Sequence, residues 1–238
     1  MNLLRQFARF LRYTPLHPQW LLGRRRAPRG IGDVTGLIID IGAADQWIAR
    51  HLSKATNYVP IDYPPTANVF YNCRPMIYAD ACHLPLTSSC ADGVICLEVI
   101  EHVPDPAQAA LEIARILKPG GQAWISMPFL YPLHNEPFDF QRYTEYGLQR
   151  DVARAGLDLI ELRRSKSAII TAGVLLCLAV AGGLDSRGAV ARTTLLPAAV
   201  PIILFTNITI WLLSLVWPDW RNMSASHHLL VQKPTQAT

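Results

Sequence analysis

Two short apolar runs that each end in an acid constrain this chain more than any other feature. Residues 37–42 read LIIDIG, so a hydrophobic run ends at Asp40 and is followed closely by Gly42. A second apolar run ends at Asp62, twenty residues after Gly42. Parallel strands that end side by side bring such residues to one edge, where glycine admits a ligand and an acid accepts bonds from ribose hydroxyls. The pattern predicts a nucleoside-binding α/β sheet.

Further patterns follow in a fixed order. They are YADA at 78–81, LPL at 84–86, ADGVICLEVIEHV at 91–103, and LKPGG at 117–121 leading into 123–128. In this order and spacing the chain resembles the class I S-adenosylmethionine-dependent methyltransferases. It is most similar to their small-molecule branch, whose members read DxGxG, LPF, LEVxEH and LKPGG. The resemblance covers roughly residues 34–164 and implies S-adenosyl-L-methionine as the cofactor.

Alternating strand and helix patterns predict an α/β fold with a doubly wound, seven-stranded, mostly parallel, Rossmann-like sheet. A hydrophobic helical insertion precedes the last strand. We expect strands at about 37–41, 57–61, 76–79, 93–97, 122–128, 158–164 and 227–233, and helices at about 44–53, 106–117 and 145–155. In the family that the chain resembles, the last strand enters antiparallel beside the fifth and sixth.

Charge and hydrophobicity divide the chain into four regions. Residues 1–32 hold seven Arg and no acid, although the whole chain carries only +4, so the basic end is an appendage suited to an anionic surface. Residues 2–13 place Leu and Phe on one helical face and Arg on the other. The regions are a basic amphipathic segment (1–29), a core (30–166), a hydrophobic insertion (167–226), and the last strand with its tail (227–238).

The insertion contains two uncharged stretches, of 18 residues at 167–184 and of 23 residues at 195–217. A bilayer crossing needs about 20 apolar residues, so a membrane hairpin is allowed. A pair of helices that dips into one leaflet and a soluble lid over the active site are the two alternatives. Arg163, Arg164 and Lys166 before the insertion favour the cytoplasmic face of a membrane for the core.

The cysteines and basic residues exclude several kinds of site. Five cysteines show no CxxC spacing, which predicts free thiols in a reducing compartment and no metal site. The basic residues cluster with Leu and Trp at one end, and no basic stripe crosses the core. Nucleic acid is therefore not an expected partner.

The resemblance assigns the cofactor-binding residues. The first acid would help to hold the methionyl ammonium, the second the ribose hydroxyls, and the third the adenine amino group. The eight assigned residues are Asp40, Gly42, Ala44, Asp62, Asp80, Ala81, Leu97 and Glu98. The chain departs from the family at Ala44 and Gln46, where glycine is usual. A side chain at position 44 is tolerated if φ is negative there.

The acceptor side is expected in residues 128–144, which crowd three prolines, five aromatic residues, a histidine, two acids and an arginine after the fifth strand. His134 is the first candidate for a general base, because its pKa lies near neutrality; ordering of the loop is its alternative role. The candidate acceptor-binding residues are Phe129, Tyr131, Asp139, Arg142 and Tyr143. In a second interpretation, Asp139 and Arg142 form an ion pair with each other and do not bind the acceptor. Glu101 and His102 match a pair that is common in the family, and the resemblance implies that His102 orients this loop more often than it acts as a base.

The leading hypothesis is a methyltransferase that acts on a hydroxyl oxygen of a small or lipid-attached acceptor at a membrane surface. The alternative is a catalytically degenerate methyltransferase-fold protein that serves as a membrane-associated partner or scaffold, for which Ala44 and Gln46 are the only support. A nicotinamide dehydrogenase would need GxGxxG, where the chain reads GAADQW.

Overall fold

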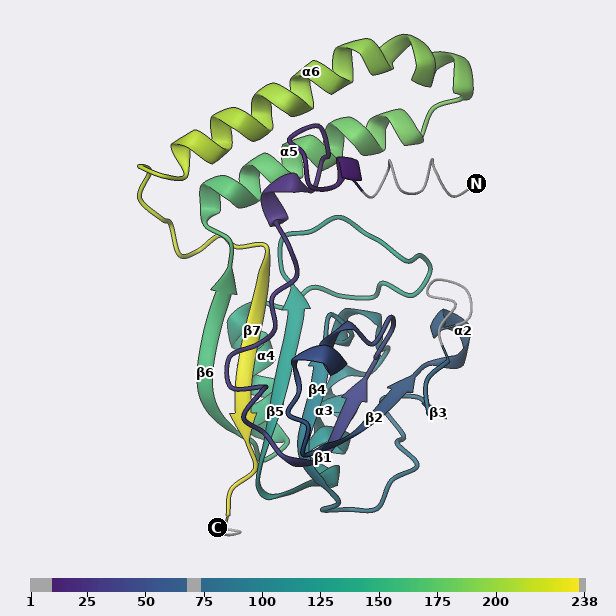
Figure 1. Cartoon of the computed structure of the whole chain (residues 1–238), viewed down its shortest axis with the longest axis vertical. Coiled ribbons are helices and arrows are strands. Elements are labelled where there is room, and N and C mark those ends of the chain that lie inside the picture. Colours follow the sequence, from purple (N-terminus) through teal and green to yellow (C-terminus); the bar gives the residue numbers. More distant parts are fainter. Residues whose placement is uncertain (1–9, 68–73, 236–238) are drawn as a thin grey trace. The chain divides into compact units, whose positions relative to one another are not determined.

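The computed structural model describes residues 10–67 and 74–235 (Figure 1). Its strands are β1 (Gly36–Ile41), β2 (Thr56–Asp62), β3 (Ile77–Tyr78), β4 (Ala91–Leu97), β5 (Leu117–Pro128), β6 (Asp158–Ser165) and β7 (Ser226–Gln232). Its α-helices are α2 (Pro64–Thr66), α3 (Pro106–Ile116), α4 (Glu145–Arg154), α5 (Ala168–Asp185) and α6 (Ala189–Leu213). Three short 3₁₀ helices are η1 (Trp20–Leu22), η2 (Trp47–His51) and η4 (Ile100–His102).

The seven strands form one sheet in the order β3-β2-β1-β4-β5-β7-β6. The neighbouring pairs from β3 to β5 are parallel, and β7 runs antiparallel to β5. Figure 1 shows β7 between β5 and β6. The predicted sheet and its antiparallel last strand are therefore confirmed. The strand order reverses between β1 and β4, and ligands of open α/β sheets bind at the carboxyl ends of strands at such a point.

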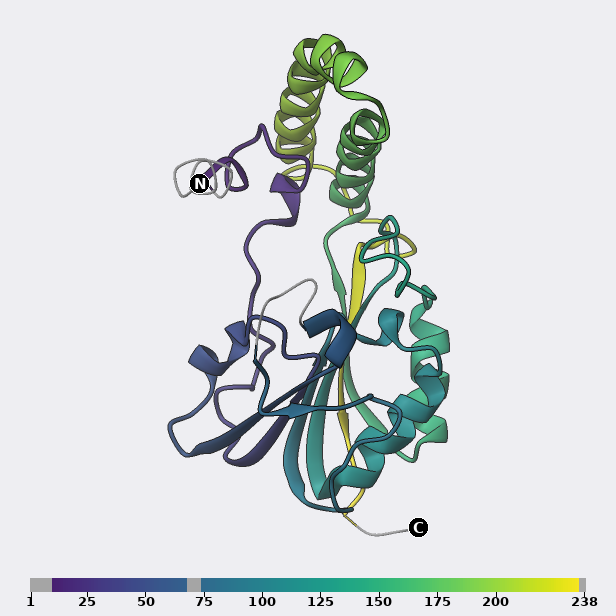
Figure 2. The ribbon, with the colours of Figure 1, turned by 90° about the vertical axis from the view of Figure 1, so that its right-hand side faces the viewer.

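The two faces of the sheet are covered differently (Figure 2). The larger cluster of buried side chains includes Ile113 of α3 and both Leu148 and Val152 of α4, packed against strand residues such as Val94. The opposite face is covered by η2 and by residues 27–34, with Ile31, Ile48 and Trp124 at the centre of a smaller cluster. True α-helices therefore cover only one face in the described part of the core.

Local chemistry explains where the core helices begin. Asp105 accepts a hydrogen bond from the Gln108 amide at 3.0 Å, and Pro106 is the first residue of α3. The Thr144 hydroxyl oxygen accepts from the Gly147 amide at 3.2 Å before α4. Each side chain satisfies a backbone donor that would otherwise have no partner in the first helical turn.

The helix expected at 44–53 is wrong in length and type. Ala44 and Gln46 have φ values of 45° and 52°, so the chain turns left-handed before it enters η2, which has only five residues. An α-helix needs negative φ throughout, and two left-handed residues at its start prevent it. β5 differs in the other direction: it begins at Leu117, five residues before the predicted start.

The chain divides into two compact units, which are described separately. The first comprises residues 1–25, 130–132 and 164–225, and the second comprises residues 26–129, 133–163 and 226–238. The second unit holds the sheet. The first joins the described N-terminal residues with α5 and α6, although the sequence pattern treats these as two regions. The amphipathic helix predicted at 2–13 lies mostly outside the described residues.

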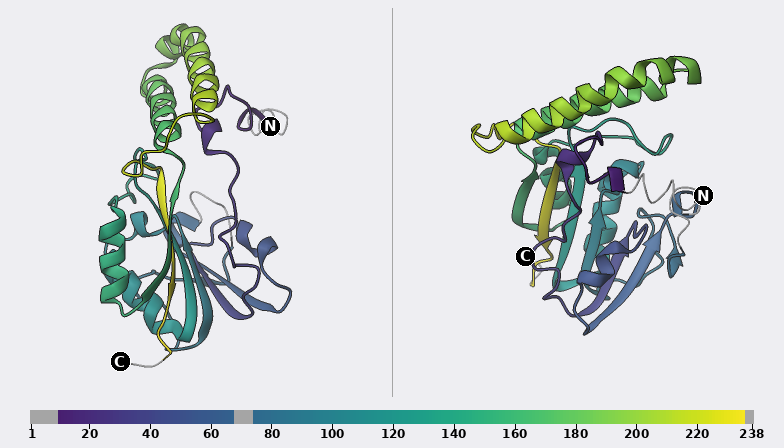
Figure 3. Two further views of the ribbon diagram at one scale, coloured as in Figure 1. Left: turned by 90° about the vertical axis from the view of Figure 1, so that its left-hand side faces the viewer. Right: turned by 45° about the horizontal axis from the view of Figure 1, so that its top comes forward.

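In the first unit α5 and α6 lie side by side (Figure 3). Asn207 of α6 is fully buried and donates hydrogen bonds to the carbonyl oxygens of Pro15 and His17, at 2.7 and 3.0 Å. The rings of Trp20 and Trp211 also meet, with centroids 6.5 Å apart. Both helices are long and apolar enough to cross a membrane by length and composition. Only 28% and 17% of their most apolar windows are buried within the protein.

Candidate functional site

A cavity of about 290 Å³ opens at the carboxyl ends of β1, β2 and β4 in the second unit. Its wall is formed by Ile41, Gly42, Ile61, Asp62, Tyr63, Thr66, Ala79, Asp80, Ala81, Glu98, Val99, His102, Val103, Pro104, Asn135, Phe138 and Phe140. The wall is mostly apolar with a few polar groups, as small-molecule sites usually are. Five of the eight predicted cofactor residues belong to it: Gly42, Asp62, Asp80, Ala81 and Glu98.

Asp62 sits at the end of β2 with only 5% of its surface exposed. Its Oδ2 accepts from the Ala44 amide at 2.8 Å and its Oδ1 from the Tyr63 amide at 2.7 Å. Burial raises the pKa of this carboxyl, and the two backbone bonds oppose that rise. Oδ1 also accepts a long bond from the Thr66 hydroxyl at 3.4 Å, which a ribose hydroxyl can displace. Oδ2 keeps a second lone pair that can accept a ribose hydroxyl.

The loop after β1 brings backbone rather than side chains to the cavity. Gly42 has φ of 68°, and a Cβ there would lie 2.4 Å from Cγ2 of Val99. Both the backbone conformation and the space therefore require glycine. Ala44 and Gln46 also adopt left-handed conformations, so the tolerance expected for Ala44 at negative φ does not apply. The family's usual glycines would relieve strain at these two positions.

Asp40 is 4% exposed and is not part of the cavity wall. It accepts a hydrogen bond from the Tyr58 hydroxyl at 2.5 Å. Burial raises its pKa to about 7, although the Tyr58 bond acts in the opposite direction. A cationic ammonium group nearby would favour the ionised carboxylate. Leu97 is also absent from the cavity wall. It packs in the smaller cluster with Ile95 and Trp124, on the face of the sheet that η2 covers.

Asp80 and Glu98 belong to the cavity wall and are held in place in different ways. Asp80 Oδ1 accepts from the Cys82 amide at 2.8 Å, which fixes the turn that carries Ala81. Glu98 has φ of 56°, and its amide donates to the Ser126 carbonyl at 3.0 Å. The Ser126 hydroxyl in turn donates to Glu98 Oε1 at 2.7 Å. Both acids are held in place from behind, as a preformed site requires.

The predicted acceptor residues do not form the cavity wall. Phe129 stacks near His227 with ring centroids 4.9 Å apart, and the Tyr131 hydroxyl accepts from Gln19 in the first unit at 2.5 Å. Tyr143 packs on the core, where burial raises its pKa to about 12. Asp139 and Arg142 form the alternative ion pair, with both Asp139 oxygens accepting from the guanidinium. The strong donors lower the pKa of Asp139 against the effect of burial.

The residues that the loop does bring to the wall are Asn135, Phe138 and Phe140, and Tyr63 joins them from the end of β2. The Tyr63 and Phe138 rings meet edge to face, with centroids 6.4 Å apart. Aromatic crowding after the fifth strand marked this loop in the sequence. Which aromatic residues turn inward depends on the bonds that tie the loop to η4, and these have no local sequence signal.

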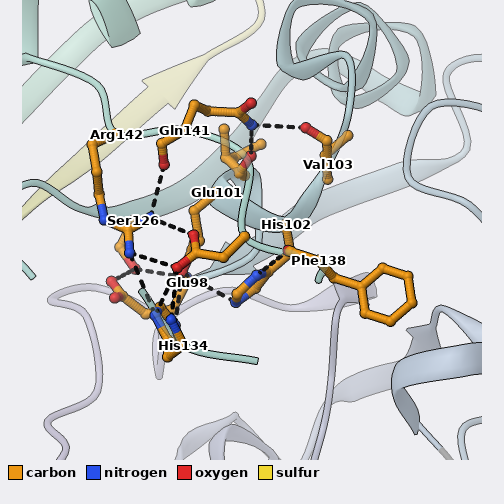
Figure 4. Close-up of polar contacts among 11 residues, drawn as sticks. Glu98, Glu101, His102, Val103, Ser126, His134, Phe138, Gln141 and Arg142 are labelled. Atoms are coloured by element: carbon orange, nitrogen blue, oxygen red, sulfur yellow. Dashed lines mark hydrogen bonds and ion pairs between the residues drawn. The ribbon is translucent and has the colours of Figure 1, made fainter. Parts of the chain in front are cut away.

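Those bonds come from Phe140 and Gln141. The Phe140 amide donates to the Glu101 carbonyl at 2.8 Å, and the Gln141 side chain donates to the carbonyls of Ile100 and Val103 at 2.6 and 2.7 Å. The loop after β5 and the 3₁₀ helix after β4 therefore form one structure (Figure 4). It places His134 beside Glu101 and His102.

Glu101, His102 and His134 point toward one another (Figure 4), and one potential ligand atom from each lies within 4.8 Å of the others. His102 is in the cavity wall, whereas Glu101 and His134 lie behind it. Burial raises the pKa of Glu101 well above its usual range, and the charge of Glu98 raises it further. The sequence predicted no metal site, because only Glu101 and His102 are adjacent and His134 follows 32 residues later, without a recognisable ligand spacing. The structure assembles a group that could hold a divalent cation.

Known proteins resemble the part of the chain that carries most of the sheet. Residues 39–125 match the family model described as a methyltransferase domain. A ubiquinone biosynthesis O-methyltransferase of Saccharophagus degradans is 38% identical over 94 residues, which are 39% of this chain and 33% of that protein. Its counterpart in Pseudomonas aeruginosa is 36% identical over 107 residues, which are 44% and 39% of the two chains. The aligned segment thus spans between a third and two fifths of the length of these relatives.

Solved structures show the same fold. Phosphoethanolamine N-methyltransferase 2 of Haemonchus contortus, solved with S-adenosyl-L-methionine, has a TM-score of 0.51 and 16% identity, covering 97% of this chain and 60% of that one. The cyclase SpnF has a TM-score of 0.53 and 15% identity, covering 87% and 78%. Identities this low support the fold alone. The cyclase also illustrates that one fold serves different reactions.

We predict that Asp62→Asn weakens binding of S-adenosylhomocysteine about a hundredfold. Two charge-assisted hydrogen bonds to ribose are each worth about 1.5–3 kcal/mol, and an amide cannot accept through both of its heavy atoms. Calorimetric titration of the folded variant measures the change. Asp158→Asn, at an exposed acid at the start of β6, is the matched control and should bind as the parent does. Equal affinity for Asp62→Asn would remove Asp62 from the site.

We predict that Ala44→Gly stabilises the protein by about 0.5–1 kcal/mol. A left-handed alanine costs about 1–2 kcal/mol, and the added chain entropy of glycine offsets about half of this. Thermal unfolding should then occur about 2 °C higher. Ala49→Gly, within η2, is the control and should not raise the unfolding temperature. A lower unfolding temperature for Ala44→Gly would contradict the strain argument.

Proposed function

The chain belongs to the class I S-adenosylmethionine-dependent methyltransferases, and we propose that it methylates a hydroxyl oxygen of a small or lipid-attached acceptor at a membrane surface. The observation that carries this proposal is the cavity at the strand ends, in which Asp62, Asp80 and the Gly42 backbone meet. S-adenosyl-L-methionine supplies a methyl group on a sulfonium that is a good leaving group. The residues present fit this cofactor, since Asp62 and Asp80 supply carboxylates at the cavity that can accept from ribose hydroxyls and from the adenine amino group.

The protein's contribution is to hold acceptor and methyl group in line in a site with little water. Tyr63, Phe138 and Phe140 make the apolar part of the wall that excludes water. The acceptor O–H loses its proton, the oxygen forms a bond to the methyl carbon, and the carbon–sulfur bond breaks. The electron pair of that bond stays on sulfur, so the product S-adenosylhomocysteine carries no sulfonium charge.

We propose that the proton of the acceptor hydroxyl is taken up by the cluster of Glu101, His102 and His134. His134 lies behind the wall, but its ring meets that of His102 edge to face at a centroid distance of 4.9 Å. His134 Nδ1 lies 3.2 Å from Asp139 Oδ2, which orients the ring and stabilises its protonated form. His134 is the proposed base when no ion is bound to the cluster, and Asp139 and Arg142 position it.

Two observations favour a hydroxyl acceptor. The relatives that match residues in the core are named ubiquinone biosynthesis O-methyltransferases. A histidine-based proton acceptor suits a hydroxyl, which must lose its proton as it is methylated. The same relatives support an acceptor that carries a lipid chain, such as a quinone-like ring or another phenol.

The first unit supports the membrane part of the proposal. Large apolar side chains of α6 and the segment after it are exposed, among them Val190, Phe205, Val216 and Trp217 at 60–80%. Exposed apolar patches of this extent mark protein or membrane contacts. Trp211, Trp217 and Trp220 suit a headgroup boundary, and Arg24 and Arg25 of the same unit suit anionic lipid. We propose that the unit contacts the cytoplasmic face of an anionic bilayer.

The scaffold alternative differs from this proposal in one measurable property, cofactor binding. Its support was the altered glycine loop. Ala44 adopts a left-handed conformation, which glycine takes without strain, and its amide donates to Asp62. Saturable binding of S-adenosylhomocysteine would exclude the scaffold, and a folded protein without it would favour the scaffold.

We predict that His134→Ala reduces methyl transfer at least a hundredfold while affinity for S-adenosylhomocysteine changes less than threefold, because His134 serves the acceptor and not the cofactor. The measurement is release of S-adenosylhomocysteine with a panel of phenols and polyprenyl-linked phenols. His51→Ala, at the exposed last residue of η2, is the control. Unchanged turnover in His134→Ala would end the proposed role.

We predict that the double variant Phe205→Glu and Val216→Glu binds vesicles of phosphatidylglycerol and phosphatidylcholine at least tenfold more weakly than the parent. Two carboxylates on the apolar surface must be desolvated on insertion. Sedimentation with vesicles measures the effect. Tyr146→Glu, equally exposed but in the second unit, is the control. Equal sedimentation of the double variant would place membrane contact elsewhere or remove it.

A further inference from the structure

Glu101 is a buried acid whose charge no described hydrogen bond compensates. It is 0% exposed, and neither carboxylate oxygen has a hydrogen-bond partner among the described residues. A buried carboxylate without hydrogen bonds is costly unless a proton or a cation neutralises it. The nearby charge of Glu98 adds to this cost, and the charge of the Arg142 guanidinium offsets part of it.

His102 presents one particular nitrogen to this acid. Its Nδ1 lies 2.6 Å from the Phe138 carbonyl oxygen, which can only accept, so Nδ1 carries the proton and donates. The other nitrogen, Nε2, lies 3.6 Å from Glu101 Oε1. In the neutral ring this Nε2 can only accept a hydrogen bond. An ionised Glu101 carboxylate also only accepts, so the two groups repel each other and form no hydrogen bond. A metal ion between the nitrogen and the carboxylate would accept a lone pair from each and remove this repulsion.

His134 repeats the arrangement from the loop after β5. Its Nδ1 lies 3.2 Å from Asp139 Oδ2, and its Nε2 lies 3.9 Å from Glu101 Oε1. Asp139 is fixed by Arg142 and by the His134 amide, which donates to Oδ2 at 2.9 Å. A carboxylate that holds the far nitrogen of an imidazole is the usual outer support of a metal-binding histidine.

We propose that Glu101, His102 Nε2 and His134 Nε2 bind one divalent transition-metal ion, with Zn²⁺ the best match. Two imidazoles and one carboxylate suit Zn²⁺ better than Mg²⁺ or Ca²⁺, which prefer oxygen ligands. Ligands of Zn²⁺ at about 2.0–2.2 Å lie roughly 3.0–3.5 Å from each other. The three atoms, now within 4.8 Å of one another, close by a rotation of the half-exposed His134 ring and a small shift of the loop.

Three protein ligands leave a coordination position open, and His102 belongs to the cavity wall. We propose that the acceptor oxygen binds at the open position. This part of the inference rests on the proposed function. A bound cation lowers the pKa of a coordinated hydroxyl. With the ion bound, the acceptor would enter as its oxyanion, having released its proton to bulk solvent, and that oxygen would attack the methyl carbon. The acceptor class narrows to phenols and other hydroxyls that ligate a metal ion.

The test uses the full chain without a histidine tag, stripped with a chelator and then equilibrated with ZnCl₂. Elemental analysis should find one Zn²⁺ per chain, and X-ray absorption should show nitrogen and oxygen neighbours at about 2.0–2.1 Å without sulfur. Glu101→Gln and His134→Ala should each weaken Zn²⁺ binding at least a hundredfold. Asp139→Asn should weaken it about tenfold, since it acts through His134.

Controls separate this inference from the proposed function and from misfolding. His83→Ala, an exposed histidine beside Asp80, should retain Zn²⁺. His134→Ala is the variant of choice should Glu101→Gln fail to fold, because the His134 side chain is 31% exposed. Binding of S-adenosylhomocysteine is measured on the same samples. Cofactor binding without stoichiometric Zn²⁺, or Zn²⁺ retained in His134→Ala, would overturn the metal site alone. Zn²⁺ bound without the cofactor would overturn the proposed function and leave the site.

Discussion

The hydrogen bond from the Ala44 amide to Asp62 Oδ2 is the contact on which the nucleotide side of the structure depends. It joins the loop after β1 to the end of β2, at 2.8 Å. Because β1 and β2 are parallel neighbours in register from Gly36 and Thr56 onward, both strand ends arrive at the same edge. The acid then fixes the loop and still offers lone pairs to a ligand. The left-handed backbone at Ala44 is the conformational strain that this bond holds in place.

A second constraint acts on the acceptor side, where a buried carboxylate requires compensation. Glu101 lies in η4, just after β4, and the loop after β5 is bonded across to the same short helix by Phe140 and Gln141. That connection brings two imidazoles to one acid. A charge buried at the end of a strand is expensive for stability, so its presence beside a cavity is more readily explained by chemistry than by folding.

The first unit follows a different physical rule. Its helices α5 and α6 pack on each other through small and polar contacts such as Gly173 against Ile210, and Asn207 satisfies carbonyls of the N-terminal segment. Most residues in the apolar windows of these helices are not buried within the protein. A soluble protein gains little from such a surface, whereas a lipid boundary gives it a favourable environment.

The sequence by itself determined the sheet, the strand ends and the acids on them. Apolar runs that end in acid and glycine follow from local rules of strand burial and backbone freedom, and the helix starts at Asp105 and Thr144 follow from capping. The short η2 in place of a helix at 44–53 was not predictable, since the left-handed turn depends on Asp62 accepting the Ala44 amide. Tertiary structure alone decided that Phe138 and Phe140 face the cavity while Tyr131 does not, and that Glu101, His102 and His134 converge. These outcomes depend on contacts between residues more than thirty positions apart, which no local pattern in the chain encodes.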